Sequence, residues 1–465
     1  MVDGRPPPDS RQDGLGHTPP RSWRSALGLY RDRRFCSIFF LGLSSGLPLA
    51  LVGNTLFMWL AREEIDKTTV GLFSVVALPY ALKFLWAPII DRVRFPLFTR
   101  FLGQRRGWAV ATQLALMAAI AAMALTDPGT NLWLLALFAL FVAICSASQD
   151  IVIDAYRVEL LEEEKIGAGA STYVFGYRVG VVISTTGALN MVGGLGWNAV
   201  YLIMAALVTI GLITILASRE PLHVVSEESA ARERRVSAYL ACRPELTRRR
   251  AAILAWLYGA AVSPFVDFMT RPCWLVMLLF VVFYKLGDSM AGVMTGYFLV
   301  ELGFSDAEIG NIGKTVGTVS TLMGFLIGGW MMAKLGLLWS LWICGGAQML
   351  SNLVFAVQAQ VGYDTGMLAI AFAIENLAGG MGTAAFVAYL SGLCNLTYTA
   401  TQYALLSAVA SVGRTLLAAP AGRLAEVLDW SPFFIVTTAA ALPGLAFLLW
   451  ITMAHRKRER DQSPR

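Results

Sequence analysis

Long apolar stretches alternate with short polar segments along almost the whole chain. Each stretch holds about 20 residues, the length that a helix needs to cross a hydrocarbon core ~30 Å thick. Twelve such stretches can be marked, at 35–59, 70–90, 109–125, 132–154, 170–192, 198–217, 273–299, 311–332, 339–357, 366–390, 402–424 and 432–453. They lack the alternation of period two that marks the strands of a membrane barrel. The pattern predicts an all-α membrane protein with 12 transmembrane helices.

Composition agrees with this prediction and excludes an ordinary soluble protein. Of the 465 residues, 56% are hydrophobic and 15% are charged, whereas soluble domains carry about 25% charged residues. Outside the apolar stretches, the polar segments on the side of both termini hold every Lys and Arg except Arg62 and Lys67. Because Lys and Arg mark cytoplasmic loops, we expect both termini in the cytoplasm. This distribution explains the net charge of +6, which therefore does not indicate nucleic-acid binding.

The chain divides into two six-helix halves around a long basic linker. The predicted parts are an N-terminal arm 1–34, a six-helix bundle 35–217, a cytoplasmic linker 218–272, a second six-helix bundle 273–453 and a basic tail 454–465. The arm is polar and rich in Pro and Gly, so we expect it to be disordered. The linker forms either a short helix on the membrane surface or a solvated connection, and the sequence leaves both open.

The two halves resemble copies of one unit. Gly71 and Gly310 stand 239 residues apart, each after a helix-start signal, and Arg178 and Arg414 stand 236 residues apart. In the second half, Ser305 with a glutamate three residues later predicts a capping box. Similar offsets at separate landmarks indicate a duplicated six-helix unit, which is the plan of the major-facilitator fold.

Eight charged side chains lie inside the predicted spans, in addition to Asp154 and Arg423 at span ends. An ionised side chain at the centre of a transmembrane helix costs about 2.5–3.5 kcal/mol, so these groups must face one another or a polar cavity. They are Lys83, Asp150, Arg178, Lys285, Asp288, Lys314, Glu375 and Arg414. Glu375 and Asp288 lie near the middle of the membrane, where alternating access exposes a site to each side in turn, and they are the expected proton-coupling acids, with Asp150 third. The alternative is a structural ion pair, for which Lys285 is one helical turn from Asp288.

Charged residues also gather at the predicted cytoplasmic ends of spans two and four. Asp150 and Asp154 are four residues apart, so both carboxylates lie on one helix face, and Arg157 follows on nearly the same face. Asp91 and Arg92 resemble the Asp-Arg pair of the major-facilitator cytoplasmic signature. We expect these five residues to form a gate, in which acids pair with basic residues across the cytoplasmic side. A purely structural lock between helix ends is the alternative.

The sequence gives no support for an enzyme. The six cysteines lack metal-ligand spacing, the three histidines lie outside the predicted spans, and no nucleophile triad or ATPase motif is present. We therefore expect no cofactor and no metal site. An ion gradient is the expected source of energy for transport.

Several longer segments carry a family resemblance. They read "KFLWAPIIDR", "GQRRGW", "CSASQDIVIDAYR", "GYRVG", "YKLGD", "ENLAGGMGTAAFVAYL" and "ATQYALLSAVASVGR", in this order along the chain. Together they resemble the AmpG family of muropeptide permeases in the major facilitator superfamily. The resemblance implies a multi-pass importer in the bacterial inner membrane, driven by the proton motive force. Its partners would be protons, membrane lipid and anhydro-muropeptides, which are GlcNAc-anhydroMurNAc with or without peptide. Such import serves peptidoglycan recycling and the induction of β-lactamase.

The same resemblance suggests which side chains meet the substrate, because muropeptides carry carboxylates and sugar rings. The expected substrate-binding residues are Arg178, Tyr177, Lys285, Arg414, Lys314 and Gln149. Two other functions stay open. One is a related transporter of acetyl-coenzyme A or another glycoconjugate, and the other is a non-transporting receptor or assembly factor.

Overall fold

The computed structural model describes residues 32–63, 65, 69, 73–95, 98–221, 227–243 and 247–462, and within these ranges every regular element is helical. The first half consists of α2 (Arg33–Leu51), α3 (Asn54–Arg62), η3 (Phe73–Ala77), α5 (Leu78–Leu82), η4 (Lys83–Leu85), α6 (Ala87–Arg92), α7 (Thr99–Leu102), α8 (Gln104–Ala124), α9 (Leu132–Leu160), η5 (Glu163–Lys165), α10 (Ile166–Val182), η6 (Ile183–Gly187), α11 (Ala188–Leu207) and α12 (Thr209–Ala217). The linker contains α13 (Glu227–Ala241), α14 (Arg248–Leu257), η7 (Tyr258–Val262) and α15 (Ser263–Met269). The second half consists of α16 (Trp274–Phe283), α17 (Leu286–Glu301), α18 (Asp306–Ile312), η8 (Gly313–Gly317), α19 (Thr318–Leu335), α20 (Leu337–Val361), α21 (Thr365–Gly392), η9 (Leu396–Tyr398), α22 (Thr399–Ala418), α23 (Ala421–Val427), α24 (Trp430–Ala439) and α25 (Leu442–Gln462). The predicted all-α membrane fold is confirmed.

The number of membrane-crossing helices is less clear-cut than the sequence pattern. Ten helical stretches of the described residues are long and apolar enough to cross a membrane, or eleven with the bent pair at 248–269. One of the ten runs for 52 residues, from Ile166 to Ala217, and Gly196, at φ +78°, turns the chain inside it. The predicted span 70–90 is divided into short pieces, because Pro79 and Pro88 each stand near the start of a new helix. The count of twelve therefore stays a prediction.

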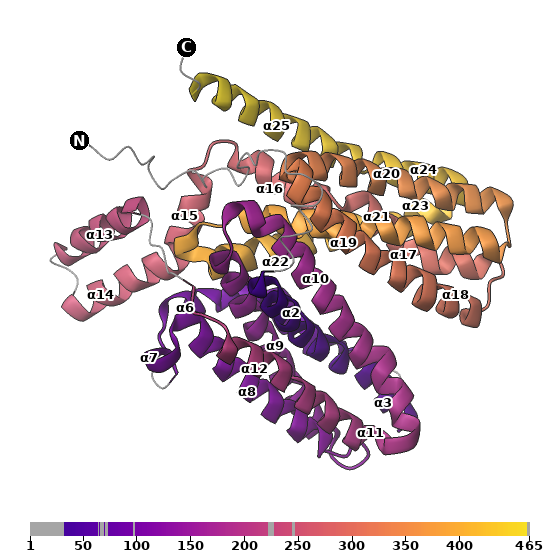
Figure 1. The fold of residues 1–465 in the computed structure, drawn as a ribbon, viewed down its shortest axis with the longest axis horizontal. Helices are drawn as coiled ribbons and strands as arrows, with labels where there is room; N and C mark the ends of the chain where they lie inside the picture. The colour runs from indigo at the N-terminus through magenta and orange to yellow at the C-terminus, as the bar shows by residue number, and fades with distance from the viewer. Residues whose placement is uncertain are drawn as a thin grey trace.

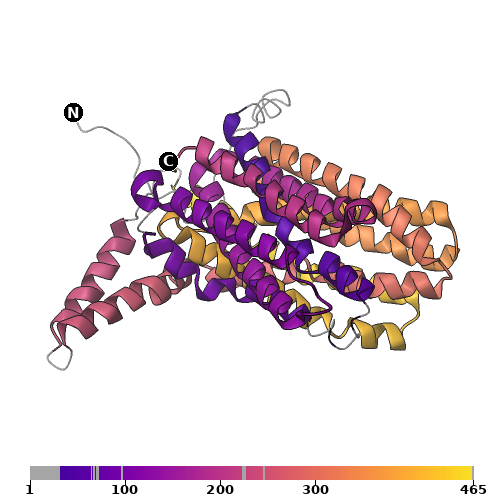
Figure 2. The ribbon, with the colours of Figure 1, turned by 90° about the horizontal axis from the view of Figure 1, so that it is seen from below.

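Two helical bundles meet at one end and diverge toward the other (Figure 1). Elements α2–α12 form one bundle, in indigo to magenta, and α17–α24 lie in the other, which is mostly orange and yellow. In the linker, α13 and α14 form a hairpin that projects beyond the end at which the bundles meet, as Figure 2 also shows. The described part of the linker is therefore largely helical, and its position relative to the membrane surface stays a prediction.

The bundles contact each other through α10, α19 and α21 on one side and through α22, α6 and α9 on the other. The Ser171 hydroxyl of α10 donates to the Phe325 carbonyl of α19, and Gly167 lies against the side chain of Met332. The start of α10 and the end of α19 belong to the side that the sequence predicts to be cytoplasmic. The two halves are thus closed against each other at that end.

Glycines let α10 approach α2 closely and so fix the position of α10. Gly42 and Gly46 of α2 lie against the backbone of Tyr173 and Tyr177, where an added Cβ would collide with carbonyl oxygens. Small residues spaced by one turn allow such close contacts between membrane helices. The packing sets the depth and orientation of the α10 segment that carries Arg178.

Local signals at the start of span eight behave as the sequence predicts. The Ser305 hydroxyl accepts from the Glu308 backbone N–H, and the Glu308 carboxylate accepts from the Ser305 backbone, so the predicted capping box is confirmed. The equivalent landmark of the first half, Gly71, lies outside the described residues.

Candidate functional site

A lysine and an aspartate lie where span seven is interrupted. Lys285 connects α16 to α17 with φ −108° and ψ 14°, outside helical values. Its Nζ donates to Thr383 Oγ1 of α21 at 2.6 Å, and Asp288 accepts from the Gln348 amide of α20. Among the described residues, neither Lys285 nor Asp288 forms an ion pair, although they are one turn apart. Hydrogen bonds to neutral partners hold both side chains instead.

Charges from both halves gather around Lys285. Lys285 interacts electrostatically with Asp288 and with three further charged side chains. These are Arg414 of α22, Arg178 of α10 and Glu375 of α21. Glu375 also accepts a hydrogen bond from the amide of the adjacent asparagine at 2.9 Å. The structure therefore brings together four of the predicted substrate-binding and proton-coupling residues with Arg178 of the other bundle.

The two arginines of this group have no acidic partner in the described part of the chain. Arg414 donates only within α22, from Nε to the Ala410 carbonyl at 3.1 Å and from Nη2 to Ser411 Oγ at 3.5 Å. Arg178 is exposed and makes no hydrogen bond to another described residue. Both guanidinium groups keep donors available for an anionic ligand.

A cavity of about 460 Å³ lies beside Arg414, between α17 and α22. It is lined by Ser289, Val293, Ser411, Arg414, Thr415, Ala418 and Ala419. Its volume lies within the ~300–1,000 Å³ usual for ligand sites. Arg414 is thus the one charged side chain in the lining of this cavity, among small apolar and hydroxyl side chains.

The first half holds a buried hydrogen-bond network around Asp150. Asp150 of α9 accepts from the Ser45 hydroxyl of α2, which also lies 3.0 Å from Tyr173 Oη of α10. The neighbouring Gln149 is fully buried, and its Nε2 donates to Ser44 Oγ at 3.2 Å. In this conformation, Gln149 therefore packs inside the first bundle and is not exposed to a ligand. Its predicted contact with the substrate stays a prediction.

Two further predicted contact residues lie in different surroundings. Tyr177 is half-buried, with its ring centroid 6.3 Å from that of Tyr173, and it precedes the exposed Arg178. Lys314 stands in the π-helical segment η8, and its side chain lies outside the described residues.

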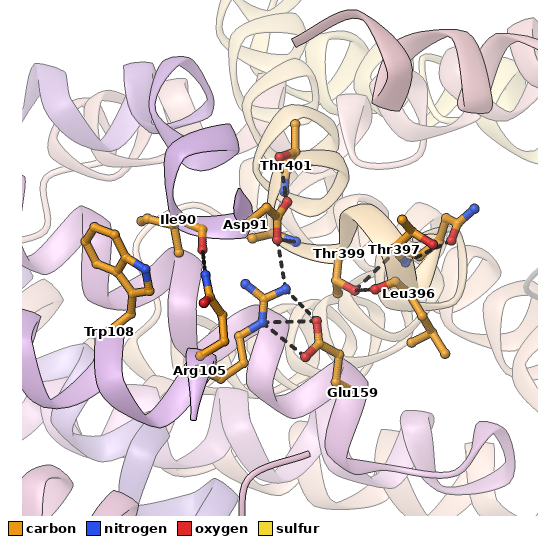
Figure 3. Close-up of polar contacts among 12 residues, drawn as sticks. Ile90, Asp91, Arg105, Trp108, Glu159, Leu396, Thr397, Thr399 and Thr401 are labelled. Atoms are coloured by element: carbon orange, nitrogen blue, oxygen red, sulfur yellow. Dashed lines mark hydrogen bonds and ion pairs between the residues drawn. The ribbon is translucent and has the colours of Figure 1, made fainter. Parts of the chain in front are cut away.

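At the end where the bundles meet, Asp91 joins the two halves (Figure 3). Its carboxylate, at the end of α6, accepts from the Thr401 backbone N–H at 2.8 Å, the Thr401 hydroxyl at 2.6 Å and the Ala400 N–H at 3.3 Å. These amides belong to the first turn of α22, where the helix dipole and unpaired N–H groups favour a negative charge. Asp91, predicted as a gating residue, thus caps a helix of the other half.

Arg105, at the start of α8, holds Asp91 in place. Its Nη2 donates to Asp91 at 2.8 Å and to Glu159 at 2.6 Å, and its Nε donates to both carboxylate oxygens of Glu159. The three side chains are at most 4% exposed. Glu159 is not among the site residues predicted from the sequence, where its only signal is its place two residues after Arg157.

Glu220 caps the same helix from the start of the linker. Its carboxylate accepts from the backbone N–H groups of Arg105 and Arg106, at 2.8 and 3.0 Å. Burial raises the pKa of Glu220 above its usual value, although the two N–H groups oppose this shift. The start of α8 is therefore fixed by acids from three segments, namely α6, α9 and the linker.

The linker also contacts both bundles. Arg92 of α6 pairs with Glu233 of α13, and the same carboxylate accepts from the Tyr398 hydroxyl of η9 at 2.7 Å. The Tyr398 hydroxyl lies 2.8 Å from Ser263 Oγ of α15. The predicted gating residue Arg92 is thus tied to the linker, and through Glu233 to the second half.

Asp154 and Arg157 are both buried, and they pair within α9 at 3.3 Å. This differs from the sequence prediction, in which the two acids of span four pair with basic residues across the cytoplasmic side. The contact between halves is made instead by the Arg157 guanidinium, which lies 5.0 Å from the ring of Tyr173 and 5.5 Å from that of Tyr403 in α22. A spacing of three residues brings the ion pair together within one helix, which satisfies the acid locally.

No cluster of histidines, cysteines and acids suited to a metal is present among the described residues, and all six cysteines are free thiols. The charged groups described above form hydrogen bonds, ion pairs and helix caps. Nothing in their arrangement resembles a nucleophile with its base.

Comparisons with known proteins agree on the fold and on a family. Residues 35–285 match the model of the Major Facilitator Superfamily. The chain is 41% identical over 426 residues to the anhydromuropeptide permease of Escherichia coli K12, covering 91% of this chain and 80% of that protein. It is 34% identical to the putative transporter AmpG 4 of Rickettsia felis, covering 91% of this chain and 97% of that protein.

Solved structures show the same fold at low sequence identity. The transporter FucP in its outward conformation superposes with a TM-score of 0.62 at 13% identity, covering 93% of this chain and 99% of that one. A bacterial homologue of the iron transporter ferroportin in an outward-facing state gives 0.60 at 17% identity, covering 90% and 99%. The chain is a multi-pass membrane transporter rather than an enzyme, and it belongs to the major facilitator superfamily and, within it, to the AmpG family of permeases.

Proposed function

We propose that this protein imports anhydro-muropeptides from the periplasm to the cytoplasm, driven by the proton motive force. Two relatives with a named function are the anhydromuropeptide permeases of Escherichia coli K12 and O157:H7, each 41% identical to this chain. Muropeptides are anionic through their carboxylates, and they present sugar rings next to a peptide. A transporter for them needs cations at mid-membrane depth and a polar environment around those cations.

The observation that carries the proposal is the pair of arginines, Arg178 and Arg414, without acidic partners among the described residues. An intramembrane cation is costly unless it is paired or serves a ligand. The two arginines come from opposite halves, and both interact electrostatically with Lys285. Substrate carboxylates would supply the missing negative charge.

The proposed cycle is alternating access, with the described arrangement as its outward-facing state. The bundles are in contact at the predicted cytoplasmic end, through Asp91, Arg105 and Thr401. Rocking one bundle against the other would open this end and close the opposite one. The gate is then Asp91 and Arg92 with their partners, together with Arg157, which contacts Tyr403 of α22 and is paired with Asp154. Asp150 is a proposed gating residue that acts from within the first half, where it accepts from Ser45.

Glu375 or Asp288 is the proposed carrier of the coupling proton, with Asp150 third. Each carboxylate is held by a neutral hydrogen-bond donor, from the amide of Asn376 for Glu375 and from that of Gln348 for Asp288. A carboxylate without a fixed cation can bind a proton without breaking an ion pair. Glu375 is preferred, because Lys285 stands one helical turn before Asp288 and favours its charged form.

The proposed location is the bacterial inner membrane with both termini in the cytoplasm, as the Lys and Arg distribution favours. Import there would return cell-wall fragments for peptidoglycan recycling. It would also deliver the fragments that signal induction of β-lactamase.

Uptake of labelled GlcNAc-anhydroMurNAc-tripeptide in a permease-null strain tests this function. We expect the wild-type chain to accumulate the label against a gradient, and Arg178→Gln and Arg414→Gln to abolish accumulation with normal membrane levels. Arg423→Gln is the matched control, because Arg423 is exposed on α23, outside the charged group. Accumulation by both variants would overturn the substrate assignment. Binding without accumulation by the wild type would favour a receptor, and uptake of acetyl-coenzyme A instead would favour the related transporter.

A further inference from the structure

The cavity between α17 and α22 differs in character from the rest of the proposed substrate site. Its lining contains no aromatic side chain and one charged side chain, Arg414. One candidate for stacking on a sugar ring, the half-buried Tyr177, belongs to α10 in the other half, beside the exposed Arg178. The two halves therefore offer different chemistry to a two-part ligand.

We propose that this cavity is the subsite for the peptide part of the ligand, and that Arg414 binds a carboxylate of that peptide. The inference rests on the proposed muropeptide function, and it assigns the two chemical parts of the substrate to different bundles. The sugars lie toward Tyr177 of α10, and the peptide enters between α17 and α22.

The geometry of α22 provides a surface suited to a peptide. Ser411, Thr415 and Ala419 are spaced by four residues, so they share one helix face, and all three are exposed. Across the cavity, Ser289 and Val293 of α17 show the same spacing. Small side chains on both walls leave the space open to a backbone, which a wall of large side chains would exclude.

The hydroxyl groups of the cavity are oriented to accept hydrogen bonds. The Thr415 hydroxyl donates to the Ser411 carbonyl at 3.0 Å, and the Ser289 hydroxyl donates to the Lys285 carbonyl at 2.8 Å. With their protons engaged inside their own helices, the oxygens keep lone pairs free. Peptide N–H groups are the donors that such oxygens would accept.

Arg414 supplies the charge that fixes the end of the peptide. Its two hydrogen bonds use Nε and, at 3.5 Å, one Nη2 proton, so most of its five N–H donors remain available. A planar guanidinium matches a carboxylate with two parallel hydrogen bonds, which a lysine cannot reproduce. Asp288 acts on the charge of Arg414 but forms no ion pair with it in the described part of the chain.

The test compares two substrates in the same variant. Uptake kinetics are measured for GlcNAc-anhydroMurNAc-tripeptide and for the peptide-free disaccharide, and the result is the ratio of their kcat/KM values. Loss of a charge-assisted hydrogen bond changes binding by about tenfold or more. We expect Arg414→Gln, and independently Ala419→Phe, which fills the cavity, to lower this ratio at least about tenfold relative to the wild type. Arg423→Gln, the same change outside the cavity, should leave the ratio unchanged.

Several results would overturn the subsite. An equal loss for both substrates would make Arg414 a general binding residue, and a rising ratio would place it against the free lactyl carboxylate of the disaccharide. If Arg414→Gln does not reach the membrane, Ala419→Phe decides alone, and an unchanged ratio for it contradicts the proposal. Failure of the wild type to take up either substrate would instead refute the proposed function, so the two failures are distinguishable.

Discussion

Asp91→Asn is the change that tests how the two halves are held together. The substitution keeps the size of the side chain and removes its charge. Asp91 makes one ion pair to Arg105 and three hydrogen bonds to the first turn of α22. In the proposed cycle the three bonds to α22 exist only while the cytoplasmic end is closed. The variant should therefore shift the equilibrium toward the inward-facing state.

The size of the shift follows from the contacts. A negative charge at a helix N-terminus is worth about 0.3–1 kcal/mol, and up to about 2 kcal/mol where it is partly buried. A hydrogen bond to a charged group is worth about 1.5–3 kcal/mol. Because asparagine still accepts one bond, we take about 2 kcal/mol as the net loss, which is a factor of roughly 30 in the ratio of the two states.

Distance measurements between spin labels provide the assay. Leu125, at the outer end of α8, and Val361, at the outer end of α20, are both exposed and belong to different bundles. Labels at these sites, with the native cysteines replaced, should report a shorter distance in Asp91→Asn as the outer end closes. Asp364→Asn is the matched control, since Asp364 caps α21 within one half, through Met367 N–H at 2.7 Å.

The reasoning fails if Asp91→Asn leaves the distance distribution unchanged while the protein remains folded. The bonds across the halves would then be present in both states, and Asp91 would be a structural cap. A shift of the same size in Asp364→Asn would also contradict the reasoning. The loss of any helix cap would then be enough to change the distance, and the bonds between the halves would not be its cause.

Three further changes test other parts of the site. Glu233→Gln weakens the contact of the linker with both bundles, so the same label pair should shift in the same direction as for Asp91→Asn but by less; no shift would make the linker contact passive. Glu375→Gln and Asp288→Asn test which acid carries the proton. The variant that lacks the coupling acid should lose concentrative uptake yet keep exchange of labelled for unlabelled muropeptide. Concentrative uptake by both variants would show that neither acid carries the proton. Asp154→Asn leaves the buried Arg157 without its acid, and since breaking a buried pair costs about 3–5 kcal/mol, we expect a lower Tm and slower uptake; a Tm equal to that of the wild type would refute this account.

Features that depend on neighbours in the chain were predictable from the sequence. The capping box at Ser305 follows from residues three apart, and it is present in the structure. The apolar stretch predicted at 366–390 corresponds closely to α21, Thr365–Gly392. Helix existence is decided by local apolar content, which the sequence displays directly.

Partners across the fold could not be derived in the same way. Asp91 and Arg92 were recognisable as part of a charged signature, but Thr401 binds Asp91 from 310 residues away. The main contacts come from backbone amides of a helix start, and every helix start carries such amides. Nothing in the sequence distinguishes the one that meets Asp91 from the others, so the partner is set by how the bundles pack.

The opposite outcome for Asp154 has the same origin. Charge alone favoured a partner across the halves, whereas Arg157, three residues on, is the nearer cation. The contact with the other half then uses the aromatic face of Tyr403, which a search for opposite charges overlooks. The position predicted as a contact between halves is one, but its chemistry is different.

Helix α22 links the two parts of the proposed mechanism. Its first turn is bound by Asp91 at Thr401, and Arg414 lies 13 residues later in the same uninterrupted helix, about 20 Å along its axis. A helix of this kind moves as a rigid element, so a displacement at one end is felt at the other. Binding of a carboxylate at Arg414 and release of the Asp91 cap at the cytoplasmic end therefore act on one rigid helix.

In the first half, α9 has a similar arrangement. Asp150 lies within the helix and Glu159 lies near its end, where Arg105 ties Glu159 to Asp91. Two helices, one from each half, thus connect the depth at which the ligand is proposed to bind with the contacts that close the cytoplasmic end. A coupling of this form requires no chain of intermediate side chains, only two rigid helices whose ends are held in one state and released in the other.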